Sequence, residues 1–193
     1  MFSIKIIRKE GMLYIFAPYH SKFVRKIKRV GSARWDPEHG AWVVNAEYIE
    51  AVRKIMTDVY GESDIPAEGK RYDVKLTFHE ECHRERDGVF FFGKCLAYAR
   101  GRDGGAKVGE GVCYLDGDCM SGGSMRYWQS IVKKGSVVMV YDVPETLVRS
   151  EKPVDGVDFE FIERVPDKDA LLREKESLLA RIAEIDTLLQ TCA

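Results

Sequence analysis

The sequence predicts an α+β protein with an N-terminal ββαββα module, a central β-rich small barrel or curled sheet, and a C-terminal coiled-coil helix. Apolar residues repeat at helical spacing in three segments, which begin near Ser21, Asn45 and Asp167. Short alternating apolar runs, separated by glycines, fill most of the region after Tyr72. The expected parts are a basic α+β module (1–61), a linker (62–70), a glycine-rich antiparallel β domain (71–165) and a helix (166–193).

The charge of the chain is unevenly distributed. Its 193 residues carry a net charge of −1, yet residues 1–60 contain eleven lysines and arginines against six acidic residues. A basic first third joined to an acidic remainder is typical of a module that meets phosphate beside one that does not. Five cysteines at irregular spacing are not a disulfide framework, and no apolar run is long enough to span a bilayer. We therefore expect a cytoplasmic protein without membrane contacts.

The first module begins with two predicted strands, Phe2–Lys9 and Leu13–Ala17, and a helix that Ser21 caps and Gly31 ends. One face of this helix is apolar. The opposite face carries four cations at positions i, i+3, i+4 and i+7: Lys22, Arg25, Lys26 and Arg29. Like charges at this spacing repel one another, so the face either binds an anion such as phosphate or is simply solvated.

A hairpin with two tryptophans follows. Pro37 favours a turn and Gly40 supplies a positive φ, so Trp35 and Trp42 are expected close together at the base of the hairpin. An exposed indole can stack on a nucleic-acid base, whereas a buried one fills a small core. We expect at least one of the two in the core, and Arg34 adds a cation beside Trp35.

The second helix of the module begins at Asn45, whose side chain can cap it, and ends at Gly61. A family pattern is carried by Tyr19, His20, Ser21, Phe23, Ile27, Lys28, Ser32 to Asp36, Trp42, Glu47 and Tyr48. With these residues, the stretch 13–57 resembles the HARP domain of annealing helicases. HARP domains bind branched or partly single-stranded DNA beside a motor, so the resemblance implies contact with DNA. The chain has no G-x-x-x-x-G-K-[ST] phosphate loop, so ATP-driven annealing does not carry over.

The central domain is predicted from short apolar strands between glycine-rich connections. The expected strands are Val74–Phe78, Val89–Phe92, Cys95–Ala99, Val112–Leu115, Val137–Val143 and Phe159–Val165. Many short strands with glycine turns are typical of a small antiparallel barrel or a curled sheet. Tyr127 and Trp128 are expected in a short helix or an irregular loop that covers the end of the barrel.

The C-terminal helix is expected to run from Asp167 to about Gln190. Leu171, Leu178 and Ile185 recur every seven residues, and Ile182 and Leu189 occupy the alternate positions of the same seam. About three heptads lie near the lower limit for self-pairing. The stripe predicts either a homodimeric coiled coil or packing onto the chain's own domains.

One motif points towards metal chemistry. His79-Glu80-Glu81-Cys82-His83 fits the H-E-x-x-H of zinc proteases, which needs a helix to bring both imidazoles to one side of the metal. Here the run follows a predicted strand, so we interpret it as a charged hairpin loop. We predict no catalytic residue, no metal and no cofactor.

Taken together, these patterns predict a non-enzymatic, nucleic-acid-binding accessory protein that acts as a homodimer. The residues expected to contact DNA are Lys22, Arg25, Lys26, Arg29, Arg34, Trp35 and Trp42. The alternative is a protein-binding adaptor or inhibitor of the kind that phages and mobile elements carry. In that case the β domain and the helix would recognise the protein partner, and the basic face would only be solvated.

Overall fold

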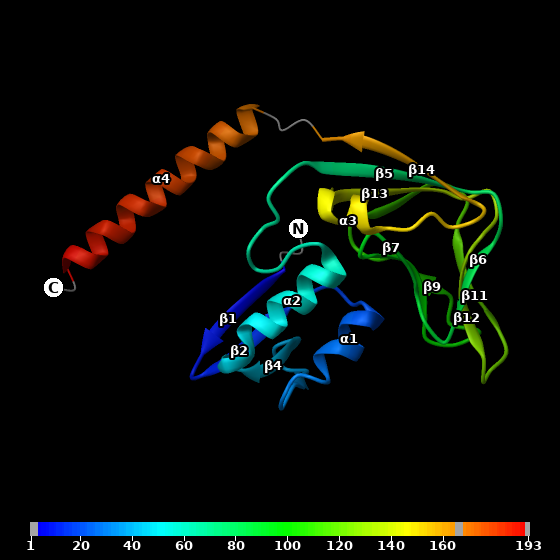
Figure 1. Cartoon of the computed structure of the whole chain (residues 1–193), viewed down its shortest axis with the longest axis horizontal. Coiled ribbons are helices and arrows are strands. Elements are labelled where there is room, and N and C mark those ends of the chain that lie inside the picture. The colour runs from blue at the N-terminus through cyan, green and yellow to red at the C-terminus, as the bar shows by residue number, and fades with distance from the viewer. Residues whose placement is uncertain (1–3, 165–167, 192–193) are drawn as a thin grey trace. The chain divides into compact units, whose positions relative to one another are not determined.

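The computed structural model describes residues 4–164 and 168–191 (Figure 1). The chain divides into two compact units, Met1–Glu163 and Arg164–Ala193. The described residues contain four α-helices and several small antiparallel sheets, which confirms the predicted α+β class. Parts of three predicted elements lie outside the described residues: Phe2 and Ser3 of the first strand, Val165 of the last strand, and Pro166, Asp167, Cys192 and Ala193 of the C-terminal segment.

The first four strands form an antiparallel sheet in the order β1-β2-β4-β3. Their bounds are Lys5–Lys9 (β1), Met12–Phe16 (β2), Arg34–Asp36 (β3) and Ala41–Asn45 (β4). Leu13 and Ile15 alternate along β2 and are fully buried. They form one core with buried side chains of helices α1 (Ser21–Ile27) and α2 (Ile49–Tyr60), so both helices pack on one face of this sheet.

Helix α1 differs from the prediction at both ends. The Nδ1 atom of His20 accepts a hydrogen bond from the Lys22 amide at 3.1 Å, so His20 and not Ser21 caps the helix. The hydroxyl of Ser21 donates instead to Asp87 at 3.0 Å. After Ile27 the backbone continues in i→i+3 hydrogen bonds, such as Val30 N–H to the Ile27 carbonyl at 2.9 Å, which end the α-helix earlier than expected.

Helix α2 ends as predicted, and its start differs slightly. The side chain of Asn45 accepts from the Glu47 amide at 3.1 Å and caps a short 3₁₀ helix, Ala46–Tyr48, that leads into α2. Gly61 ends α2 at φ +78°, and its amide donates to the carbonyl of Thr57 at 2.9 Å. A left-handed residue at this position satisfies carbonyls that the helix leaves open.

The other strands form three antiparallel sheets in the orders β10-β13-β5-β14, β11-β12-β6 and β7-β8-β9. Their bounds are Arg71–Phe78 (β5), Cys82–Glu85 (β6), Val89–Phe91 (β7), Lys94–Ala99 (β8), Ala106–Lys107 (β9), Val112–Asp116 (β10), Cys119–Gly123 (β11), Trp128–Val132 (β12), Val137–Pro144 (β13) and Val157–Glu163 (β14). Helix α3 (Glu145–Ser150) follows β13 directly.

Of the two alternatives predicted for this domain, the small barrel is wrong and the curled sheet stays a prediction; the predicted position of Trp128 is also wrong. None of the sheets in the described chain closes into a barrel, because each ends in an unpaired edge and strands such as β7 and β9 are only three and two residues long. Trp128 lies in neither a helix nor a loop. It begins β12, which pairs with both β11 and β6.

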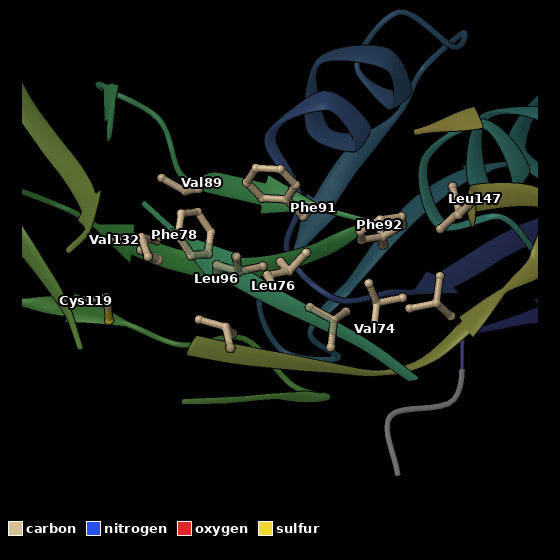
Figure 2. Close-up of a cluster of buried hydrophobic side chains, with 14 residues drawn as sticks. Val74, Leu76, Phe78, Val89, Phe91, Phe92, Leu96, Cys119, Val132 and Leu147 are labelled. Atoms are coloured by element: carbon tan, nitrogen blue, oxygen red, sulfur yellow. The ribbon is translucent and has the colours of Figure 1, made fainter. Parts of the chain in front are cut away.

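The three sheets and α3 share one apolar core (Figure 2). Val74, Leu76 and Phe78 alternate along β5 and are fully buried, as a strand with one inward face requires. Leu96 from β8 and Leu147 from α3 reach the same cluster (Figure 2). Segments far apart in the sequence therefore depend on one another for burial.

Aromatic rings connect the N-terminal module to strands β7 and β8 within Met1–Glu163. The His20 ring stacks on Phe90 with centroids 4.0 Å apart, and Tyr19 lies 4.6 Å from Tyr98. Burial lowers the pKa of His20 from 6.5 to about 4, and Lys22 acts in the same direction. The neutral imidazole is therefore both a helix cap and part of the packing between the two regions.

In the second unit the described residues 168–191 form a single helix, α4 (Lys168–Thr191), of 24 residues. Its leucine and isoleucine side chains are exposed in the isolated chain. No helix in the described ranges is both long and apolar enough to cross a membrane.

Candidate nucleic-acid interface

The four predicted cations of α1 fall into two pairs with different surroundings. Lys22 and Lys26 both bind Asp58 of α2, and the Lys22 Nζ atom lies 3.4 Å from Asp58 Oδ2. Arg25 and Arg29 are exposed, and neither is within 4.0 Å of an acidic side chain in the described part of the chain. A single carboxylate of a neighbouring helix therefore binds two of the four cations on the face that the sequence predicts to be uniformly basic.

The ion pairs of Asp58 are weak enough to be exchanged for another anion. The hydrogen bond from Lys26 is the main reason that the pKa of Asp58 lies below its usual range. The side chains of all three residues are about 39–46% exposed. Exposed pairs of this kind contribute about 0–1 kcal/mol, so a nucleic-acid phosphate can compete for both lysines. Asp58 is a functional candidate that local pattern reading missed, because it is remote in sequence from α1.

The two tryptophans are neighbours, as predicted, and differ in exposure. Trp35 of β3 pairs directly with Trp42 of β4, and their ring centroids are 5.7 Å apart. Trp42 belongs to the module core and is 9% exposed, whereas Trp35 is 51% exposed. Strand β3 is the edge of its sheet. The Trp42 indole is fixed in the core, and the Trp35 indole packs against it and is exposed to solvent.

Arg34 is exposed but does not share a sheet face with Trp35. Successive residues of a strand point to opposite faces, and Arg34 pairs with Val43, which pairs in turn with Tyr14. Trp35 lies on the same face as Trp42 and Ile15, the face that packs against the helices. The guanidinium of Arg34 and the indole of Trp35 therefore flank the open edge of the sheet from two sides.

Three residues in the turn of this hairpin lie close enough together to be possible metal ligands, and hydrogen bonds within the turn account for their proximity. Asp36, Glu38 and His39 bring ligand atoms within 4.8 Å of one another. Asp36 accepts hydrogen bonds from the amides of Glu38 and His39 at 3.0 and 3.3 Å, and its other oxygen lies 2.8 Å from His39 Nδ1. The His39 hydrogen bond is also the main reason that the pKa of Asp36 is lowered. The carboxylate is thus already used in building the turn.

The H-E-x-x-H run does not form a zinc-protease site. Cys82 and His83 belong to strand β6, so His79 and His83 are not on one face of a helix. His79 instead lies 2.7 Å from Asp158 of β14. His79, Glu80 and Glu81 connect β5 to β6, and Cys82 and His83 begin β6. This differs from the predicted hairpin loop because β6 pairs with β12 and not with β5.

The residues predicted for dimerisation all lie on α4. They are Leu171, Leu178, Ile182, Ile185 and Leu189, and each is 42–63% exposed in the isolated chain. Leu172, Leu179 and Leu188 widen the same apolar stripe. A stripe this broad exceeds a strict two-residue seam.

Comparisons of the chain with protein-family models, with curated proteins and with solved structures found no match.

Proposed function

We propose that this chain is a non-enzymatic nucleic-acid-binding accessory protein whose N-terminal module contacts single-stranded or branched DNA. The exposure of Trp35 carries the proposal. Its half-exposed indole is fixed against Trp42 on an edge strand, and Arg34 lies beside it in sequence. A rigid exposed indole is suited to stacking on an unpaired base, which contributes about 1–3 kcal/mol per base.

The cations supply the second part of the proposal. Arg25 and Arg29 are exposed and are not engaged with acidic groups among the described residues, so phosphate binding at these positions breaks no ion pair. Lys22 and Lys26 would join when phosphate displaces Asp58. The likeness of residues 13–57 to HARP domains supports the same function, limited to DNA contact without a motor.

We also propose that α4 pairs two copies of the chain. Eight exposed leucines and isoleucines on one 24-residue helix form a larger apolar stripe than an isolated helix keeps in water. A dimer would place two N-terminal modules on one nucleic acid and raise affinity through effective concentration. Analytical ultracentrifugation of the full chain and of Ile182→Lys tests this step, and a monomeric parent protein would contradict it.

Fluorescence anisotropy with labelled single-stranded, duplex and forked DNA tests the DNA proposal. The test variant is Arg25→Glu/Arg29→Glu, and the control is Lys133→Glu/Lys134→Glu, which makes the same charge change on exposed residues between β12 and β13. We expect the first variant to lose most of its affinity and the second to keep it. The logarithm of the binding constant should fall with the logarithm of salt concentration at about 0.7 per phosphate neutralised on a single strand.

Trp35→Ala separates stacking from charge. It should weaken single-stranded and forked DNA binding by about tenfold or more, leave the salt slope unchanged, and affect duplex binding little. The proposal would be contradicted by an equal loss of DNA affinity in both charge-reversal variants, or by no DNA binding of the parent protein at low salt. The basic face would then be a solvated surface, and the alternative function, a protein-binding adaptor, would be favoured.

A further inference from the structure

A cavity of about 580 Å³ lies between the N-terminal residues and the β domain within Met1–Glu163. Its lining residues include Tyr19, Tyr60, Tyr98 and Phe92. The hydroxyl of Tyr60 donates to the carbonyl of Pro18 at 2.7 Å, which fixes that ring. The volume is within the range of about 300–1,000 Å³ found for small-molecule sites. No base stack or phosphate contact proposed above uses this cavity.

One part of the cavity lining is charged, and its arginine is already occupied. Arg71 donates to both oxygens of Glu62 at 2.8 and 3.1 Å and to both carboxylate oxygens of Asp142 at 2.5 and 3.1 Å. Its guanidinium therefore has two carboxylate partners and serves as a fixed part of the wall.

Lys94 at the start of β8 differs from Arg71 because it has no carboxylate partner among the described residues. Its side chain is partly buried and lines the cavity, and no carboxylate of the described residues lies within 4.0 Å of its ammonium group. Burial lowers the pKa of Lys94, although Asp142, Glu62 and Glu110 are near enough to oppose this effect. An ammonium withdrawn from bulk water without a direct partner is unfavourable. An anion in the cavity would supply that partner.

Two lining residues are held in strained backbone conformations. Phe92 has φ +49° and Asp142 has φ +59°, a region that residues other than glycine rarely adopt. The Phe92 amide donates to Glu151 at 3.0 Å and the Asp142 amide donates to Asp73 at 2.9 Å, so the fold holds both in place. The backbone of both lining residues is therefore held in position.

We propose that this cavity binds a small molecule with a planar aromatic body and one anionic group. Tyr19 and Tyr98 pack against the body, and the Lys94 ammonium binds the anion. Nucleoside monophosphates and aromatic carboxylates share this chemistry. The site does not depend on the DNA-binding proposal, since its residues lie apart from the proposed DNA-contacting set.

Isothermal titration calorimetry of the full chain with AMP and with indole-3-acetate tests the site and separates the two sources of the anion. Adenosine lacks the anion, and inorganic phosphate lacks the ring. We expect at least one of the first two ligands to bind with 1:1 stoichiometry and both controls to bind at least about tenfold more weakly. AMP alone would assign a nucleotide site, and indole-3-acetate alone would assign a carboxylate site.

Lys94→Met keeps the length of the side chain and removes its charge. It should weaken ligand binding by about tenfold or more, while the unfolding temperature stays equal or rises and DNA affinity is unchanged. The matched control is Lys152→Met, which removes a charge from an exposed loop and should bind normally. The proposal is overturned if neither ligand binds at about 1 mM, if either control binds as tightly as its parent ligand, or if Lys94→Met binds normally. A lower unfolding temperature in Lys94→Met would also overturn it, by making Lys94 a structural residue.

Discussion

Replacing His20 with asparagine should remove a pH-dependent part of the protein's stability. The folded chain holds His20 neutral because burial, with Lys22 and Arg25, lowers its pKa to about 4, whereas Asp87 acts in the opposite direction. The unfolded chain protonates this residue near pH 6.5. As pH falls from 6.5 towards 4, the unfolded state therefore binds a proton that the folded state does not, and stability falls. Well above pH 6.5 neither state binds this proton, and the residue contributes no slope.

The magnitude follows from the pKa difference. Each pH unit between the two pKa values changes the unfolding free energy by about 1.4 kcal/mol, so about 2 kcal/mol is lost between pH 6.5 and pH 5. Asparagine can still cap α1 through its side-chain oxygen but does not titrate. His20→Asn should therefore be less stable than the parent at pH 7, because the Phe90 stack is lost, and should show a much flatter pH profile.

Urea unfolding followed by circular dichroism at about pH 7, 6 and 5 measures this difference. The slope of free energy against urea must stay constant across pH for the comparison to hold. A parent protein that is equally stable at pH 7 and pH 5 would refute the reasoning. So would a His20→Asn variant with the parent's full pH dependence, since the titrating group would then lie elsewhere.

Three further changes test other parts of the structure. Asp58→Asn frees Lys22 and Lys26, and it should tighten DNA binding and steepen its salt dependence in anisotropy titrations. Leu96→Ala removes a fully buried side chain from the β-domain core and should lower the unfolding free energy by about 2–5 kcal/mol in urea. Gly61→Ala forces a β-carbon into a left-handed position, 2.7 Å from Leu147, and should cost more than about 1 kcal/mol in the same assay. Normal DNA affinity for Asp58→Asn, or parent-like stability for either core variant, would contradict the corresponding argument.

Local chemistry explains which parts of the fold the sequence predicts well. Gly61 ends α2 through its own left-handed backbone conformation, which depends little on distant parts of the chain. The Trp35–Trp42 pair follows from a short hairpin with Gly40 at φ +61°. Both features depend on residues within a few positions of one another. They can be predicted from spacing alone.

The failures share a different cause, since each depends on tertiary pairing. Ser21 resembles a helix cap, but its hydroxyl binds Asp87, a residue 66 positions away. Trp128 begins a strand because β6 and β11 pair with it from both sides. Asp58 binds Lys22 and Lys26 from another helix, and the cavity around Lys94 is assembled from separate segments. No local pattern carries this information.

The segment that connects α2 to β5 has a consequence for how the protein can be divided. Thr146 donates to the carbonyl of Gly61 at 3.0 Å, and the amide of Glu145 donates to the carbonyl of Lys70 at 3.0 Å. Arg71 binds Glu62 across the same segment. Separating the first sixty residues from the β domain would remove the packing partners of Tyr19 and His20 and would also expose these polar groups. We therefore expect Met1–Glu163 to melt in a single calorimetric transition and the first sixty residues to be a poor module for transplantation into another protein.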